Sequence, residues 1–201
     1  MKPLATNIAD FEALRKAGLL YVDKTAWLHR LVTDPSRTFF FCARPRRFGK
    51  SLSVTTLKSI FLGHREFFDG LAIAATDYDW RPHAVVHFNW GRVSAASLEE
   101  FERTLVVAVR DSLAESGYAY DEALLPSDNL ARAIDFFYRR DGVGAAILID
   151  EYDDPVAKAL ANVDLAEQIR TRLSAIYAQF KDNSGKIRFL YITGVSKFTK
   201  L

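Results

Sequence analysis

The sequence predicts an α/β fold with a mostly parallel sheet, because short apolar runs alternate with helical segments along the chain. The run TFFFCA at residues 38–43 is too short for a helix and is followed by Arg-Pro, which is typical of a strand buried on both faces. Similar runs follow at residues 84–90, 145–150 and 188–195. We therefore expect four strands, separated by helices, to form one sheet.

The segments between these runs carry helix signals. Asp10 is a candidate N-cap and Gly18 a stop for a first short helix, and Asp164 with Glu167 resembles a capping box at the start of the last one. The stretch LLYV at residues 19–22 is a brief strand candidate. The expected helices cover residues 10–20, 23–32, 50–63, 97–117, 129–140 and 164–181.

Composition limits the class of protein. With 201 residues, of which 49% are hydrophobic and 26% charged, the chain is expected to form one soluble globular domain, or one domain with a small appendage. The net charge of +2 is too small to indicate a nucleic-acid-binding surface. The N-terminal stretch lacks the apolar core of a signal peptide, and no window approaches the length of a membrane span. Cys42 is the only cysteine, which fits a reducing compartment, so we expect a cytoplasmic location.

The stretch RPRRFGKS at residues 44–51 ends like a phosphate-binding loop. Such a loop gathers backbone N–H groups around the phosphates of a nucleotide, and the N-terminus of the next helix adds its own unpaired N–H groups. In this interpretation Lys50 contacts the phosphates, Ser51 binds Mg²⁺, and Gly49 lets the backbone approach closely. Gly-Lys-Ser alone is a weak signal, but here it lies between a buried strand and an amphipathic helix. Arg44 stands where the loop normally opens with glycine, which leaves open a decayed site or a basic surface turn.

A second group of polar residues is expected at the same edge of the sheet. The strand AILIDE delivers Asp150 and Glu151 at its carboxyl end, where ligands bind in an open α/β sheet. A carboxylate there can hold Mg²⁺, and its neighbour can orient and deprotonate the attacking water. On its own, the pair also fits an ordinary acidic strand end. The last strand ends ITGVSK, so the hydroxyl of Thr193, or failing that of Ser196, can hydrogen-bond the γ-phosphate or that water.

Four motifs, in this order, resemble the bacterial and archaeal AAA-ATPase-like family of P-loop ATPases. They are YVDKT at residues 21–25, RPRRFGKSL at 44–52, LIDEYDDP at 148–155 and ITGVSKF at 192–198. The resemblance runs from about Phe11 to the last residue. It implies a P-loop NTPase three-layer sandwich with ATP and Mg²⁺ as ligands, and it makes the arginine at the start of the loop a trait of the family.

The resemblance also implies roles for the motif residues. Asp150 joins Ser51 as a metal ligand, Glu151 is the catalytic base, and Thr193 is a sensor-like polar residue. Asp23 is implied to contact adenine, although a helix cap made by Asp23 or Thr25 fits equally well. The loop residues implied to bind the nucleotide are Arg44, Pro45, Arg46, Arg47, Phe48, Gly49, Lys50, Ser51 and Leu52. The three arginines of this loop can instead contact acidic residues of a partner domain, or DNA. For any single one of them, a solvated or ion-paired side chain is a better interpretation than a binding role.

The expected organisation is a helical segment at residues 1–37 packed on a P-loop ATPase core at residues 38–201. Members of the family typically continue through a helical lid and often a restriction-endonuclease-like nuclease domain, so the resemblance implies a core that stops before its last strand and lid. In the usual strand order, 5-1-4-3-2, the missing strand would lie beside TFFFCA and leave it as an exposed apolar edge. We therefore expect self-association unless LLYV covers that edge. Contact with nucleic acid is expected only through a fused domain.

The leading hypothesis is an ATP-binding, Mg²⁺-dependent ATPase core. An alternative is a nucleotide-dependent switch or interaction module with little hydrolysis of its own, because no lid and no arginine finger is identified in the chain. A basic nucleic-acid-binding domain is disfavoured by the nearly neutral charge, and the four histidines lack metal-ligand spacing.

Overall fold

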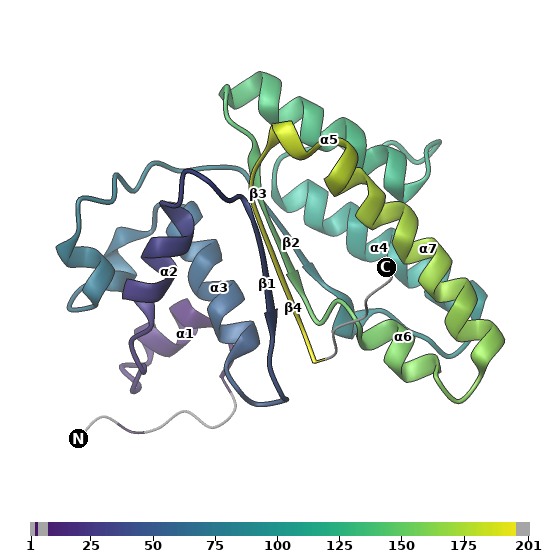
Figure 1. The fold of residues 1–201 in the computed structure, drawn as a ribbon, viewed down its shortest axis with the longest axis horizontal. Helices are drawn as coiled ribbons and strands as arrows, with labels where there is room; N and C mark the ends of the chain where they lie inside the picture. The colour runs from purple at the N-terminus through teal and green to yellow at the C-terminus, as the bar shows by residue number, and fades with distance from the viewer. Residues whose placement is uncertain (1–2, 4–7, 196–201) are drawn as a thin grey trace.

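The computed structural model describes residue 3 and residues 8–195, which form a central sheet with a layer of helices on each face (Figure 1). Within these residues the sheet has four strands, all parallel, in the order β1-β4-β3-β2. The strands are β1 (Phe39–Ala43), β2 (Val85–Asn89), β3 (Ala145–Asp150) and β4 (Ile187–Gly194). Every predicted apolar run is a strand whose ends differ by no more than one residue from the expected ones, so the prediction of a parallel α/β fold is confirmed.

The helices divide between the two faces of the sheet (Figure 1). One face carries α1 (Phe11–Lys16), α2 (Thr25–Val32) and α3 (Lys50–Phe61). The other carries α4 (Leu98–Glu115), α5 (Pro126–Asp141), α6 (Asp154–Ala159) and α7 (Val163–Asp182). Successive strand residues point to opposite faces, so Ala146 and Leu148 of β3 pack with the first layer while Ile147 and Ile149 pack with the second. All six residues of β3 are buried, as the continuous apolar run predicts.

Helix ends follow local capping chemistry, with one correction to the prediction. The Asp10 carboxylate accepts a hydrogen bond from the Ala13 N–H at 2.7 Å and starts α1, and Gly18 follows it with a left-handed φ of 65°. The predicted capping box at Asp164 is wrong. Asn162 caps α7 instead, because its Oδ1 accepts from the Leu165 N–H at 3.1 Å, and Asp164 lies inside the first turn.

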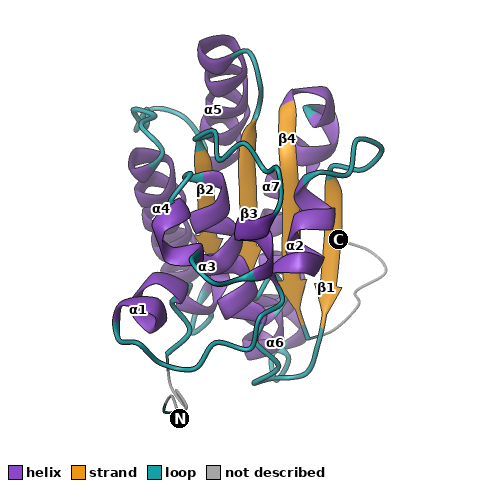
Figure 2. Cartoon of the chain, turned by 90° about the vertical axis from the view of Figure 1, so that its left-hand side faces the viewer, coloured by secondary structure: helices purple, strands orange, loops and turns teal. Residues whose placement is uncertain are grey.

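Strand β1 is an edge of the sheet, with β4 as its only partner among the described residues (Figure 2). Phe39 and Phe41 on this strand are 42% and 46% exposed. The stretch LLYV does not form a strand and does not cover this edge. Leu20 instead donates its N–H to the Pro3 carbonyl at 2.9 Å, and the Tyr21 ring packs edge-on against Phe11. The predicted apolar edge is confirmed within the described part of the chain.

The topology brings three chain segments together at the carboxyl edge of the sheet. The loop after β1 leads directly into α3, and the Arg44 N–H extends the strand pairing by donating to the Gly194 carbonyl at 3.1 Å. Because β4 lies between β1 and β3, the end of β4 is next to both the loop and the acidic end of β3. No helix among the described residues is both long enough and apolar enough to span a membrane.

Candidate functional site

The loop between β1 and α3 bends at two residues with left-handed backbone, Arg47 with φ 65° and Gly49 with φ 74°. Arg44 is not among the residues with positive φ, so the left-handed turn falls three positions after the place where the loop opens. Gly49 is the N-cap of α3 and offers no side-chain hydrogen bond. The first N–H groups of α3 therefore have no side-chain cap, which suits a helix N-terminus that binds an anion.

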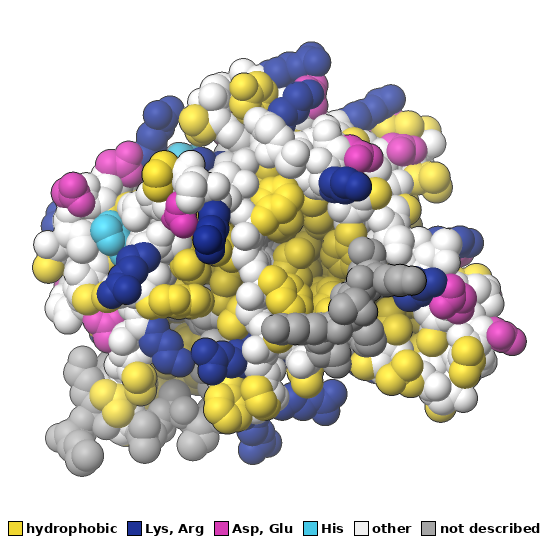
Figure 3. Space-filling view, viewed as in Figure 1, with side chains coloured by type: hydrophobic (Ala, Val, Ile, Leu, Met, Phe, Trp, Pro, Cys, Tyr) yellow, Lys and Arg dark blue, Asp and Glu magenta, His cyan; other side chains and the backbone are white. Residues whose placement is uncertain are grey.

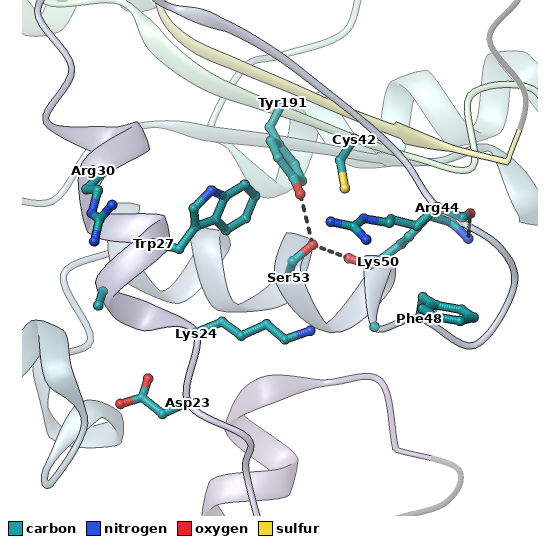
Figure 4. A pocket seen from close by; sticks show the side chains of 12 residues that line it. Asp23, Lys24, Trp27, Arg30, Cys42, Arg44, Phe48, Lys50, Ser53 and Tyr191 are labelled. Atoms are coloured by element: carbon teal, nitrogen blue, oxygen red, sulfur yellow. Dashed lines mark hydrogen bonds between the residues drawn. The ribbon is translucent and has the colours of Figure 1, made fainter.

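Lys50, the first residue of α3, is 7% exposed and turns into the loop (Figure 4). Its ammonium group donates to the carbonyl oxygens of Arg44 and Pro45, both at 3.0 Å. The first turn of α3 is tied to the sheet by Ser53, whose hydroxyl donates to the Lys50 carbonyl at 2.6 Å and lies 3.1 Å from the Tyr191 hydroxyl of β4. The loop thus holds a buried cation against its own carbonyl groups.

The acidic end of β3 is joined to the end of β4 by Thr193. Asp150 is 1% exposed, and its Oδ1 accepts a hydrogen bond from the Thr193 hydroxyl at 2.5 Å. The same hydroxyl oxygen accepts from the Glu151 N–H at 3.3 Å, and the Thr193 carbonyl accepts from the Tyr152 N–H at 2.9 Å. The hydroxyl of Thr193, the predicted sensor, therefore donates its hydrogen bond to Asp150. Ser196, the second candidate, lies outside the described residues.

Glu151 has a left-handed backbone with φ 56°, which is rare for a residue other than glycine and is a conformation found at functional sites. Its side chain is half-buried. Burial, together with the negative charges of Asp150 and Asp154, raises the pKa of the Glu151 carboxyl, while Lys50 and Lys158 oppose this shift. A carboxyl with a raised pKa is more basic once it is ionised, which suits a proton acceptor.

Two cavities open on either side of the N-terminus of α3. One, of about 590 Å³, is lined by both Ser51 and Asp150, together with Asn89 and His87 of β2. The other, of about 500 Å³, lies between α2 and the loop and is lined by Gly49 and Lys50 (Figure 4). Ser51 and Asp150 are far apart in the sequence, and the fold brings them to one cavity.

A hydroxyl and a carboxylate fit Mg²⁺, which binds through one or two carboxylates and keeps several waters. The described residues contain no cluster of three or more histidine, cysteine, aspartate or glutamate side chains that would hold a metal by themselves. The donor set of Ser51 and Asp150 therefore matches a metal that is shared with a phosphate ligand more than a purely protein-held metal.

Asp23 lines the second cavity, but its carboxylate is occupied by hydrogen bonds. One oxygen accepts from the Thr25 N–H at 2.8 Å and the Thr25 hydroxyl at 2.7 Å, and the other accepts from the Ala72 N–H at 2.8 Å. Partial burial by itself raises the pKa of Asp23, but these hydrogen bonds outweigh it and hold the pKa below its usual value. In this structure Asp23 orders the start of α2 and the turn at Ala72–Ala75.

The remaining loop residues differ in where they lie. Arg46, Arg47 and Phe48 are exposed, with Phe48 at 60%. The Leu52 side chain packs against the apolar cluster beneath α3. Lys24, which the motif YVDKT contains, lines the cavity of Figure 4, and so does Trp27, which sequence reasoning did not identify. Trp27 is 44% exposed, so it lies off the buried face of the amphipathic helix α2. A tryptophan off the apolar face of such a helix is the signal that would have singled it out.

A parallel sheet between two helical layers, whose edge strand runs through such a loop into a helix, defines a P-loop NTPase-like sandwich. The chain belongs to the family described as "Predicted AAA-ATPase", whose model matches residues 5–201, so the resemblance seen in the motifs is confirmed. A relative from Azotobacter chroococcum mcd 1, "Uncharacterized protein in vnfD 5'region", is 32% identical over 205 residues. That match covers 100% of this chain and 38% of the relative, so the chain spans well under half of that protein. No solved structure matches the chain.

Proposed function

We propose that the chain binds ATP with Mg²⁺ at the loop of residues 44–52 and hydrolyses it. The observation that carries the proposal is the cavity shared by Ser51 and Asp150 beside the uncapped N-terminus of α3. Membership of the AAA-ATPase-like family supports the use of ATP. Together with Lys50 and Glu151, these features would provide the three parts that phosphoryl transfer needs, which are N–H donors and a cation for the phosphates, ligands for a metal, and a base.

In the proposed mechanism the Lys50 ammonium exchanges the carbonyls of Arg44 and Pro45 for phosphate oxygens of ATP. Ser51 and Asp150 would hold Mg²⁺, which would supply positive charge to neutralise the phosphates of ATP. Glu151 orients the attacking water and accepts its proton. The Thr193 hydroxyl of β4 holds the Asp150 carboxylate in place. In this mechanism Thr193 therefore acts on the bound nucleotide through Asp150 and does not contact it directly.

The base of the nucleotide is proposed to enter the cavity between α2 and the loop. The exposed indole of Trp27 offers a flat apolar surface there for stacking, and Lys24 extends toward Gly49 (Figure 4). Asp23 contributes to this part of the site as a residue that orders the cavity wall.

Two substitutions test the proposal by calorimetry and a phosphate-release assay. Lys50→Ala should abolish ATP binding, because the loop then lacks its buried cation. Glu151→Gln should keep ATP binding and lower turnover by about 10²-fold or more, the typical contribution of a general base. Lys181→Ala, an exposed lysine on α7, is the matched control and should change neither.

Normal ATP binding by Lys50→Ala would show that the assignment of the site is wrong. Tight binding by the wild-type chain without measurable turnover would instead support a nucleotide-dependent switch. The two functions are therefore separated by measuring affinity and turnover on the same preparation.

A further inference from the structure

The Glu151 carboxylate lies directly against Gly91, in the turn Trp90–Arg92 that follows β2. A Cβ atom added at Gly91 would overlap Glu151 Oε2 and would lie 3.1 Å from Glu151 Cδ. Gly91 is not among the glycines with positive φ, so its backbone conformation is open to any residue. Because Gly91 has no side chain, it leaves space at this position, and the Glu151 carboxylate occupies that space.

The turn that contains Gly91 is held on both sides. The Gly91 N–H donates to Asn89 Oδ1 at 3.0 Å, and its carbonyl accepts from Lys158 Nζ at 2.7 Å. Lys158 in turn pairs with Asp154 of α6 at 2.6 Å. Trp90, next to Gly91, is fully buried and its ring is stacked on Phe88. If the two groups collide, the end of the flexible Glu151 side chain will move more readily than this turn.

No group among the described residues donates a hydrogen bond to the Glu151 carboxylate. Its position is therefore set by the left-handed backbone at Glu151, which directs the side chain, and by the surface against which the carboxylate lies. That surface is the bare Cα of Gly91.

We propose that Gly91 is a positioning residue for the catalytic carboxylate, and this inference rests on the proposed hydrolysis of ATP. The absence of a side chain at residue 91 lets the Glu151 carboxylate lie against the turn, and in this proposal that position is the one from which it accepts a proton from the attacking water. A general base must lie within hydrogen-bond reach of that water, and a displacement of about 1 Å can cost about 10²-fold in rate.

The test is Gly91→Ala, with Gly185→Ala as the matched control. A Cβ at Gly185 would meet no atom within 4 Å, and its φ is not left-handed, so this variant carries the same chemical change without the collision. We expect Gly91→Ala to keep the wild-type melting temperature and the ATP dissociation constant within about twofold, while kcat falls by at least about tenfold. Gly185→Ala should change none of these. A wild-type kcat in Gly91→Ala would overturn the proposal.

A double-substitution cycle separates positioning from general damage. In a Glu151→Gln background, adding Gly91→Ala should cause no further loss of turnover, because the group that Gly91 positions is no longer a base. If Gly91 acts only on folding, the two losses will multiply, and the proposal fails.

Crystal structures of the wild type and of Gly91→Ala give a readout that does not depend on hydrolysis. A carboxylate displaced from residue 91, with the backbone of residues 89–93 unchanged, supports the proposal. A carboxylate that stays while the turn moves contradicts it. Failure of the proposed function is recognised separately, as absence of wild-type turnover or as ATP binding by Lys50→Ala.

Discussion

Thr193 is the residue on which the two acidic positions of the candidate site depend. Its hydroxyl donates to the buried Asp150 carboxylate and accepts from the Glu151 N–H. Thr193 itself has no exposed surface, so water cannot replace the hydroxyl if it is removed. A buried charged group that loses a hydrogen-bond donor keeps its full desolvation cost.

Thr193→Val keeps the shape of the side chain and removes the hydroxyl. We expect it to lower the free energy of unfolding by about 1–3 kcal/mol, because Asp150 is left without that donor. Thr193→Ser keeps the hydroxyl and should cost less, about 1 kcal/mol, for the lost methyl group. Urea unfolding measures both. Equal losses in the two variants would show that packing, and not the hydrogen bond, is what Thr193 provides.

The backbone of the loop takes a left-handed conformation at one position that the sequence does not mark. Arg44, which opens the loop, has no positive φ. The left-handed conformation that a glycine usually provides at the start of such a loop is taken here by Arg47, deeper in the loop, and by Gly49. No local pattern marks Arg47 for this, because arginine has no preference for the left-handed region.

At the scale of elements, a small polar cluster joins α1 to the last turns of α3 and to the segment that follows α3. Glu12 Oε1 lies 2.7 Å from His64 Nδ1 and accepts from the Ser59 hydroxyl at 2.9 Å. Partial burial by itself raises the pKa of Glu12, but the hydrogen bonds from His64 and Ser59, with the charges of His64 and Lys16, lower it below its usual value.

This cluster predicts a pH-dependent contribution to stability. Because the pKa of Glu12 is lower in the folded state, the contribution is complete above the unfolded value of about 4.3 and is lost as the pH falls through the folded value. Glu12→Gln should therefore be less stable than the wild type by about 1 kcal/mol or less at pH 6, and the difference should shrink as the pH falls below about 4.3. Thermal unfolding across that range measures it. A difference that grows with falling pH would contradict the assignment.

The correction at α7 also belongs to this scale. Asn162 and Asp164 are both good N-cap residues, and the sequence offers Glu167 as a partner for the second. The structure uses Asn162, so the helix begins at Val163. Capping depends on where the chain enters the helix, and the loop from α6 decides that here.

At the scale of the whole molecule, the open edge of the sheet is the feature with the largest consequence. Hydrophobic side chains gather in the middle of the face seen in Figure 3, between the layer of α1–α3 and the layer of α4–α7. Strand β1 carries Phe39 and Phe41 at this edge with one side of its backbone unpaired by any described residue. Such an edge is a template for pairing with another chain.

We predict concentration-dependent self-association of the chain and its reduction by Phe39→Lys. A lysine on an edge strand opposes pairing, and Phe39 is exposed enough for the change to be tolerated. Leu160→Lys, at a 60% exposed position after α6, adds the same charge away from the edge and should leave self-association unchanged. Sedimentation at increasing concentration measures both variants. A wild-type chain that remains a monodisperse monomer at high concentration would contradict the prediction.

The sequence by itself determined the four strands, most of the helices and the order of the motifs along the chain. These are local properties, since a strand buried on both faces must be apolar throughout and an amphipathic helix must repeat its apolar residues. Only the tertiary structure decided that Ser51 and Asp150 share a cavity. It also decided that the Asp23 carboxylate accepts hydrogen bonds from Thr25 and Ala72. The contact of the Glu151 side chain with Gly91 is a third such feature. Most of these contacts join residues far apart in the chain, and all of them depend on side-chain directions that no local periodicity contains. The chemistry of the candidate site is thus readable from residue types, whereas its geometry comes from the four parallel strands, whose carboxyl ends meet at one edge of the sheet.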